Sequence, residues 1–206
     1  MGFYGRRILP HVINVACGAK SLRPLRERVC AGLTGEVVEL GFGSGHNVGC
    51  YPSTVTRVRA VEPSDGGWQL ARKRLATSAI PVERAGLDGQ ALPFEDDTFD
   101  AALSTYTLCT VPDADRALRE LRRVLRPGGT LHFLEHGLAP DPKVQRWQHR
   151  LDPLERRLAG GCEFSRPIDE LITGAGFTIT EVDHFYEPGG PRFAGALSLG
   201  RAEAGR

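Results

Sequence analysis

The chain has 206 residues, a length typical of one domain built around a single hydrophobic core. Hydrophobic residues make up 41% and charged residues 25% of it, which excludes collagen-like, coiled-coil and disordered proteins. Lys and Arg number 26 against 25 Asp and Glu, so the net charge of +1 creates no field that would draw the chain to nucleic acid. We therefore expect no nucleic-acid partner.

The cysteine content and the N-terminal sequence predict in which cellular compartment the protein resides. Five cysteines, an odd number without a Cys-x-x-Cys pair, favour free thiols in a reducing environment. The start lacks the basic-then-apolar pattern of a signal peptide, and the apolar stretch 8–19 is shorter than the roughly 20 residues of a membrane span. We expect a cytoplasmic protein without an integral membrane segment.

Residues 4–31 are predicted to be helical, with interruptions near Gly18 and Pro24. Their apolar side chains are expected to cover the active site or the core, and the alternative is peripheral contact with a membrane surface. The residues in question are Phe3, Tyr4, Ile8, Leu9, Val12 and Ile13.

Four short β-branched runs, at 36–41, 57–62, 99–104 and 130–135, are typical of buried strands. Between the last two, apolar residues at helical spacing over 112–126 predict a one-faced helix that begins at Pro112 and stops at a Pro-Gly-Gly sequence. Strands alternating with helices indicate a parallel open sheet with helices on both faces.

The C-terminal part has a different pattern. Two strand-like runs, 177–182 and 193–199, are separated by a Glu-Pro-Gly-Gly-Pro sequence that is too short for a helical crossover, so we expect an antiparallel hairpin. The chain then divides into an N-terminal helical cap (1–34), a core (35–136), an insert on the substrate side (137–176) and C-terminal strands (177–206), all within one domain (1–206).

The first predicted strand runs into a turn with glycines at 41, 43 and 45. Without Cβ atoms, the backbone there lets a ligand approach closely. His46 stands where the dinucleotide fingerprint has its third glycine, and the turn lacks the lysine of a phosphate-binding loop, so both nucleotide motifs fit poorly.

The second predicted strand ends at Glu62, about 20 residues after Gly41. At this offset a carboxylate can accept hydrogen bonds from both ribose hydroxyls, which indicates a nucleoside ligand. The alternative is that the glycines form only a tight turn and that Glu62 is a solvated strand end.

A wider set of motifs then carries a family resemblance. The glycine turn after Glu39, the Val61-Glu-Pro sequence, the segment Asp88-Gly-Gln-Ala-Leu-Pro-Phe, Phe99-Asp and Arg123-Val-Leu-Arg-Pro-Gly-Gly together resemble the class I S-adenosylmethionine-dependent methyltransferases over residues 35–136. The resemblance implies an enzyme that uses S-adenosylmethionine and releases S-adenosylhomocysteine. It also implies an α/β, Rossmann-like seven-stranded sheet, mostly parallel with a C-terminal antiparallel hairpin and helices on both faces.

The same resemblance assigns the cofactor residues. It places the turn (Gly41, Phe42, Gly43, Gly45) and Glu39 around the methionine part, Glu62 with Pro63 at the ribose, Asp88 and Gly89 at the adenine, Thr105 on the methionine side, and Asn47 near the carboxylate. Phe42 and Leu87 depart from the commoner small residues, for which we expect altered packing. Independently, a sulfonium and an ammonium favour carboxylates over phosphate-binding lysines.

Flanking segments indicate the acceptor. Leu108-Cys-Thr-Val, Phe133-Leu-Glu-His, Trp147, Leu151-Asp-Pro and Gly161-Cys are similar to the thiol S-methyltransferases, so a small apolar molecule with a thiol is our first expectation. The alternatives are C- or O-methylation of a quinone-like or lipid-like acceptor, a nicotinamide-dependent oxidoreductase, and a cofactor-binding protein without catalysis.

His136 is the candidate base, because it ends a strand where open α/β sheets place reactive groups. Glu135 would fix its tautomer or face away, and the alternative for His136 is a turn residue bonded to backbone. Cys162 lies in the predicted insert and is either a small buried thiol or a cavity residue. Neither Cys109 with His136 nor Cys162 with His184 has zinc-ligand spacing, so we expect no metal.

Overall fold

The computed structural model describes residues 4–187 and 189–205. Its seven strands form one sheet in the order β3-β2-β1-β4-β5-β7-β6, in which β7 is antiparallel to both of its neighbours and the other pairs are parallel. The strands are β1 Gly35–Leu40, β2 Val55–Val61, β3 Val82–Gly86, β4 Phe99–Thr105, β5 Leu125–His136, β6 Phe177–Tyr186 and β7 Ala196–Ala204. The predicted Rossmann-like sheet with its antiparallel C-terminal hairpin is confirmed.

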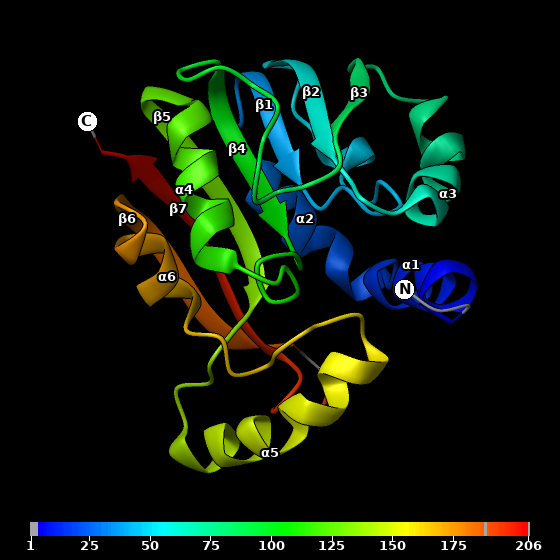
Figure 1. Ribbon diagram of the computed structural model, residues 1–206, viewed down its shortest axis with the longest axis vertical. Coiled ribbons are helices and arrows are strands. Elements are labelled where there is room, and N and C mark those ends of the chain that lie inside the picture. The colour runs from blue at the N-terminus through cyan, green and yellow to red at the C-terminus, as the bar shows by residue number, and fades with distance from the viewer. Residues whose placement is uncertain (1–3, 188, 206) are drawn as a thin grey trace.

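Helices cover both faces of this sheet (Figure 1). One face packs against α4 and α6, and the opposite face packs against α2 and α3, whereas α5 lies beyond the carboxyl ends of the parallel strands. The helices are α1 Leu9–Cys17, α2 Arg23–Cys30, α3 Asp65–Leu75, α4 Ala114–Val124, α5 Pro142–Leu158 and α6 Ile168–Gly174, together with a π-helical turn Tyr4–Ile8 and two 3₁₀ turns, Lys20–Leu22 and Val48–Cys50.

Helix α4 shows how the sequence pattern determines the packing. Asp113 caps its N-terminus, where its carboxylate accepts a 2.9 Å hydrogen bond from the backbone N–H of Arg116. The apolar stripe that predicted the helix is buried against the sheet, with Leu118, Leu121 and Val124 fully inaccessible to solvent. Burying each such side chain contributes about 1.5–3 kcal/mol, so this stripe fixes the helix on the sheet.

The strands differ from the sequence prediction in several places; β6, for example, continues to Tyr186, beyond its predicted end at residue 182. Strand β3 was not among the predicted runs, because Glu83 and Arg84 break its pattern at the sheet edge, where polar side chains remain solvated. Strand β5 begins before its predicted Thr130 and includes the Pro-Gly-Gly sequence. Strand β7 begins at Ala196, later than predicted, and continues through Gly200 to Ala204.

The N-terminal helix α1 is less buried than its sequence suggested. Leu9 and Pro10 are its buried residues, whereas Val12 and Ile13 are exposed, as is Ile8 just before it. Most of these apolar side chains therefore do not cover the core, so covering the active site or contacting a membrane surface stays a prediction; Phe3 lies outside the described residues. Within 4–187 and 189–205, no helix combines the length and apolar character that crossing a membrane requires.

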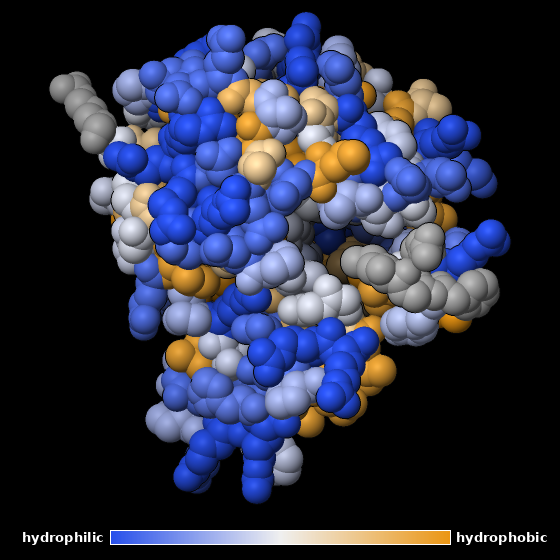
Figure 2. Space-filling model, viewed as in Figure 1, coloured by the Kyte–Doolittle hydropathy of each residue, from blue (hydrophilic) through white to orange (hydrophobic). Residues whose placement is uncertain are grey.

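The carboxyl ends of β1, β2 and β4 meet at the edge of the sheet that faces the N-terminal helices and α5 (Figure 1). The space-filling view shows the molecular surface hollowed between these parts (Figure 2). Open α/β sheets bind their ligands in such a crevice outside the strand ends. The fold therefore brings the sequence-predicted residues to one place.

Candidate functional site

The turn after β1 leaves part of its backbone uncovered. Gly41 has φ +69°, and a Cβ there would lie 2.0 Å from Thr107 Oγ1, so packing requires glycine. Gly43 has φ +58°, but the nearest atom to an added Cβ would be the Gly41 carbonyl oxygen at 3.9 Å. The Gly43 backbone therefore borders open space in which a ligand can lie against it.

Glu62 follows β2 and lies directly beside this turn. Its carboxylate accepts hydrogen bonds from the backbone N–H groups of Gly43 at 2.5 Å and of Ser64 at 2.7 Å, and only 5% of the residue is exposed. Burial raises the pKa of this carboxyl, against those two hydrogen bonds. The structure thus places Glu62 next to Gly43, as the sequence predicted.

Glu39, near the end of β1, is fully buried. Its carboxylate accepts a 2.9 Å hydrogen bond from Asn47 Nδ2 and a short hydrogen bond from the Tyr51 hydroxyl. Burial raises the pKa of Glu39 to about 7, even though both hydrogen bonds and the positive charge of Arg26 oppose the shift. This carboxyl group therefore titrates near neutral pH.

Arg26 on α2 completes the network and was missed by the sequence analysis. Its Nη1 donates to Asn47 Oδ1 at 2.8 Å and to Thr105 Oγ1 at 3.3 Å, and its guanidinium lies 5.4 Å from the centre of the Tyr106 ring. The Nε atom is buried and has no hydrogen-bond partner within the described part of the chain. In a sequence rich in arginine, nothing distinguished this residue from the exposed ones.

The other predicted cofactor residues lie around this network in different environments. Asp88 is exposed, and the backbone N–H and side chain of Gln90 lower the pKa of its carboxyl. Gly89 is buried. A Cβ at this position would lie 2.3 Å from the Leu40 side chain, so the packing requires glycine. Pro63 is exposed, whereas Phe42 points into the core, where it packs against Trp68 with ring centres 5.2 Å apart.

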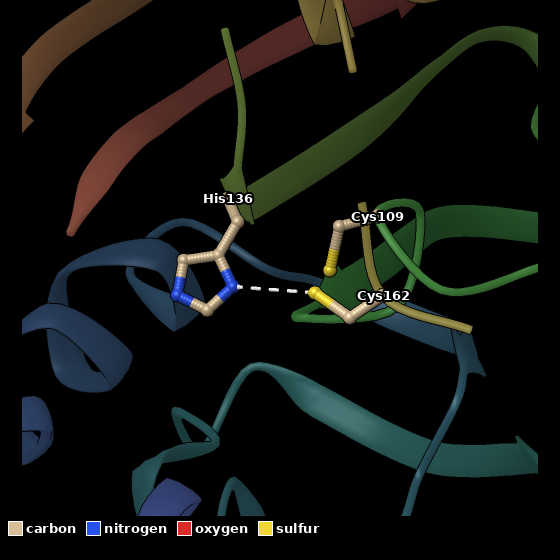
Figure 3. A group of neighbouring side chains, drawn as sticks. All are labelled: Cys109, His136 and Cys162. Atoms are coloured by element: carbon tan, nitrogen blue, oxygen red, sulfur yellow. Dashed lines mark hydrogen bonds between the residues drawn. The ribbon is translucent and has the colours of Figure 1, made fainter. Parts of the chain in front are cut away.

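Three reactive side chains meet beyond the ends of β4 and β5. Cys162 Sγ lies 4.0 Å from His136 Nδ1, and Cys109 Sγ belongs to the same group, whose donor atoms all lie within 4.8 Å of one another (Figure 3). The sequence separation of Cys109, His136 and Cys162 gave no sign of this proximity. The spacing argument used above against a metal therefore does not hold for these residues.

His136 is surrounded by side chains. Its ring lies 5.0 Å from that of Tyr106 and 6.1 Å from that of Phe164, so it is not the backbone-bonded turn residue of the alternative interpretation. Glu135 faces the opposite side of β5, where it accepts hydrogen bonds from Ser104 Oγ at 2.7 Å and the Thr107 backbone N–H at 2.8 Å. It therefore holds the loop after β4 and does not orient the imidazole.

Two further histidines, His132 and His46, contact backbone. His132 Nδ1 lies 2.8 Å from the Val29 carbonyl oxygen, which is the structural role expected of a strand histidine. His46 Nε2 lies 3.0 Å from the Asn14 carbonyl oxygen and joins the glycine turn to α1. Burial, with the charges of Arg74 and Arg26, lowers the pKa of His46 to about 4, so it is neutral at physiological pH.

A cavity of about 800 Å³ lies behind the glycine turn. Its lining includes the basic residues Lys20, Arg23 and Arg74, together with Arg26, which it shares with the polar network, and no carboxylate among the described residues. A sulfonium ligand would be repelled by such a lining. The strand ends with Glu62 and Glu39 have the opposite sign of charge and are the better candidate for that ligand.

Comparisons with known proteins agree with this geometry. The model of a methyltransferase domain family matches residues 38–133. The human thiol S-methyltransferase TMT1A is 32% identical over 166 residues, which cover 77% of this chain and 67% of the human protein. The demethylmenaquinone methyltransferase of Clavibacter sepedonicus is 35% identical over 120 residues, or 58% of this chain and 49% of that protein. The chain thus spans between half and two thirds of the length of these relatives.

A solved S-adenosylmethionine-dependent methyltransferase from Thermotoga maritima superposes with a TM-score of 0.67 at 25% identity, covering 94% of each chain. The chain belongs to the class I S-adenosylmethionine-dependent methyltransferases. It is therefore an enzyme, and its cofactor is S-adenosylmethionine.

The residues at the strand ends fit this cofactor. The uncovered backbone at Gly43 leaves room for it, the carboxyl group of Glu39 suits its cationic methionine part, and the carboxyl group of Glu62 can accept hydrogen bonds from its ribose hydroxyls. The buried Nε of Arg26, which has no partner among the described residues, is a candidate donor for its carboxylate. The residues present are therefore chemically compatible with S-adenosylmethionine.

Proposed function

We propose that this methyltransferase acts on a small, apolar acceptor and that the methylated atom is a thiol sulfur. The main support is the similarity to TMT1A, whose 166 aligned residues extend well beyond the 38–133 segment that methyltransferases of many specificities share. The similarity thus includes parts of the chain outside the cofactor core, where acceptor specificity arises.

For the nucleoside half of the cofactor, we assign the ribose to Glu62 and the adenine edge to Asp88 with the Gly89 amide. Glu62 lies beside the uncovered Gly43 backbone, with Pro63 directly after it. Phe42 contributes its backbone, because its ring is buried in the core. The exposed Asp88 would become partly covered when the cofactor binds.

For the methionine half, we assign the carboxylate to Arg26 and the ammonium to the side of Glu39. Asn47 and Thr105 hold the Arg26 guanidinium in place through hydrogen bonds of 2.8 and 3.3 Å. Gly41 and Gly45 shape the turn that borders this part. When bound, S-adenosylmethionine supplies a methyl group on a sulfonium sulfur, which keeps the electron pair of the bond that breaks.

The acceptor is assigned to the region around Tyr106, His136, Cys109 and Cys162. Tyr106 lies between Arg26 and His136, at distances of 5.4 Å from the guanidinium and 5.0 Å from the imidazole. It has the unusual φ of +54°, and its hydroxyl is buried without a hydrogen-bond partner among the residues described. An acceptor that reaches this region would satisfy that hydroxyl.

Thiol methylation needs little catalytic machinery. A thiol with a pKa of about 8.5 is already a few per cent thiolate at neutral pH, so alignment and exclusion of water provide most of the acceleration. The apolar residues around Phe164, among them Leu151 and Phe193, suit the exclusion of water. His136 would accept the proton of an acceptor that binds as a thiol.

A second candidate is methylation of a quinone-like acceptor. It rests on the 35% identity to demethylmenaquinone methyltransferase, but that match covers only 58% of the chain. A quinol carbon or oxygen is a weaker nucleophile than a thiolate and would depend more strongly on His136 as a base.

The test is a methyl-transfer assay with S-adenosylmethionine labelled in its methyl group. Hydrogen sulfide and small alkyl thiols are compared with quinols and phenols, and the products are identified by mass spectrometry. We expect label in thioethers and in methanethiol. Label found only on carbon or oxygen would refute the thiol assignment, and a variant with Glu62→Ala serves as the control for cofactor-dependent transfer.

A further inference from the structure

Cys109, His136 and Cys162 form a compact group of metal-binding side chains from three separate segments. Cys109 lies in the loop after β4, His136 ends β5, and Cys162 follows α5. Figure 3 shows the two sulfur atoms side by side, with an imidazole nitrogen directed at Cys162. The donor atoms lie within 4.8 Å of one another, and the distance from Cys162 Sγ to His136 Nδ1 is 4.0 Å.

These distances are close to those of a tetrahedral zinc site. With Zn–S bonds of about 2.3 Å and Zn–N bonds of about 2.0–2.1 Å, neighbouring ligand atoms are roughly 3.5–3.8 Å apart. Small side-chain rotations would therefore bring the three atoms onto one ion. Two thiolates and an imidazole are also a ligand set that favours Zn²⁺ over Mg²⁺ or Ca²⁺.

The backbone around the group is held in place from several sides. The Glu163 backbone N–H donates a 2.9 Å hydrogen bond to the Cys109 carbonyl oxygen, which joins the two cysteine loops. Gly161 permits this approach, because it has φ +107° and a Cβ there would lie 3.0 Å from the Thr110 carbonyl oxygen. The buried carboxylate of Asp152 accepts a 2.7 Å hydrogen bond from the Phe164 N–H.

Glu135 supports the other cysteine. Its carboxylate accepts hydrogen bonds from the backbone N–H groups of Thr107 at 2.8 Å and Cys109 at 3.4 Å, and it extends from the strand that also carries His136. Cys109 and His136 are thereby fixed to one strand. Such supporting contacts keep metal ligands in position before the ion arrives.

We propose that Cys109, His136 and Cys162 bind one Zn²⁺ ion, and that its open fourth position binds the sulfur of the methyl acceptor. The second part rests on the function proposed above. Three protein ligands with one open position are the arrangement of catalytic rather than structural zinc sites. Tyr106, whose ring packs on His136 and faces Arg26, connects the group with the region assigned to the methionine part of the cofactor.

The ion would replace the base that the sequence predicted. As the acceptor sulfur bonds to Zn²⁺, its S–H bond breaks and the proton passes to water, so the acceptor is held as a thiolate. A lone pair of the acceptor sulfur would then form the new S–C bond while the methyl–sulfonium bond of the cofactor breaks and its electron pair stays on the sulfur of S-adenosylhomocysteine. The thioether product carries no charge and is a weaker zinc ligand, so it leaves. His136 acts here as a ligand through Nδ1.

The metal site can be tested without methyl transfer. The full-length protein is freed of metal with a chelator, kept reduced and titrated with Co²⁺, which reports thiolate ligands through charge-transfer absorption. We expect one Co²⁺ per chain in the wild type and in the control Cys50→Ser, whose thiol lies outside the group. Cys109→Ser and Cys162→Ser should lose the band, and His136→Asn should weaken Co²⁺ binding by more than the roughly 10- to 100-fold that the loss of an outer-shell partner costs.

Folding of each variant is checked by circular dichroism and by binding of S-adenosylhomocysteine. Should Cys162→Ser be unstable, Cys109→Ser gives the same comparison. A wild-type protein without a charge-transfer band, or a band that persists in folded Cys162→Ser, would overturn the metal site and return His136 to the role of proton acceptor.

A second measurement tests the role of the ion. A small alkyl thiol added to the Co²⁺ protein should strengthen the charge-transfer band, because a third sulfur binds. An unchanged band would overturn acceptor binding at the metal. If the band responds but no thiol is methylated, the proposed function fails and the metal site stands. If chelator-treated, metal-free protein methylates thiols at the full rate, the function stands and the metal proposal fails.

Discussion

The Arg26 guanidinium donates a 2.8 Å hydrogen bond to the Asn47 side-chain oxygen and so joins α2 to the turn after β1. The Asn47 amide in turn donates to Glu39 at 2.9 Å and to Thr105 at 3.0 Å. Three segments that are far apart in the chain thus meet at one buried polar network. We assigned the methionine end of the cofactor to this network, and the first prediction tests that assignment.

Replacing Arg26 by Gln should weaken the binding of S-adenosylhomocysteine. A charge-assisted hydrogen bond to the ligand carboxylate contributes about 1.5–3 kcal/mol, so we expect roughly a 10- to 150-fold higher dissociation constant in calorimetry. Arg28→Gln is the matched control, because Arg28 lies on the same helix but forms an exposed ion pair with Asp183. Equal affinities in the two variants would show that the carboxylate binds elsewhere.

Glu62→Ala should also reduce cofactor affinity, here at the ribose. The loss of a charged acceptor costs about 1–3 kcal/mol, or roughly 5- to 150-fold in the dissociation constant. Glu83→Ala, on the neighbouring strand β3, removes an exposed carboxylate of the same type and should bind the cofactor normally. An unchanged dissociation constant for Glu62→Ala would contradict the ribose assignment.

Two glycine substitutions distinguish the cost of backbone strain from the exclusion of the cofactor by an added methyl group. Gly43→Ala and Gly128→Ala both place a side chain at positive φ, +58° and +80°, and in neither case would the Cβ meet an atom closer than 3.9 Å. Each should lower the free energy of unfolding by about 1 kcal/mol. Only Gly43→Ala should weaken cofactor binding, by roughly 1–3 kcal/mol, because its methyl group would occupy the space assigned to the ligand. Equal binding by both variants would place the ligand away from Gly43.

The buried Glu39 predicts a pH dependence of cofactor affinity. Its pKa of about 7 means that part of the population is protonated at neutral pH, and a cationic ligand favours the ionised form. The dissociation constant of S-adenosylmethionine should therefore fall as pH rises from about 5.5 to about 7.5, below the range near pH 8 in which an α-amino group titrates. Glu39→Gln should bind more weakly and lose this dependence, and a pH dependence that persists in Glu39→Gln would assign it to another group.

The raised pKa of Glu39 also makes the stability of the unliganded protein depend on pH, but here a rise in pH is unfavourable. Because the folded protein holds the Glu39 proton more tightly than the unfolded chain, whose carboxyl has a pKa of about 4.5, the free energy of unfolding should decrease as pH rises from about 4.5 to 7. Denaturant titrations of the wild type and Glu39→Gln over this interval measure the contribution, which should be absent from the variant.

The sequence alone identified those candidate site residues that lie close to one another along the chain. The glycine turn, Glu39 and Asn47 lie within one strand-turn segment, and Glu62 ends the next predicted strand, so spacing alone carried the information. Periodicity predicted the open α/β sheet and its C-terminal hairpin, and the family resemblance implied the seven strands; the charged residues of the edge strand β3 hide its pattern.

The rest depends on contacts between distant segments. Arg26 reaches the site from α2 and becomes buried only when α2 packs on the sheet. No local sequence pattern predicts this burial. Cys109, His136 and Cys162 come together because three loops meet beyond β4 and β5. Their separations in the chain match no ligand motif, so the sequence predicted no metal. The structure brings these three side chains close enough together to bind one metal ion.

A crystal structure with S-adenosylhomocysteine would test the central assignment most directly. We expect the ribose hydroxyls at Glu62, the carboxylate at Arg26, and the open side of the sulfur directed toward Tyr106, His136 and the two cysteines. A sulfur that faces a closed wall, or a ligand bound in the basic cavity lined by Arg74 and Lys20, would contradict the proposed direction of methyl transfer.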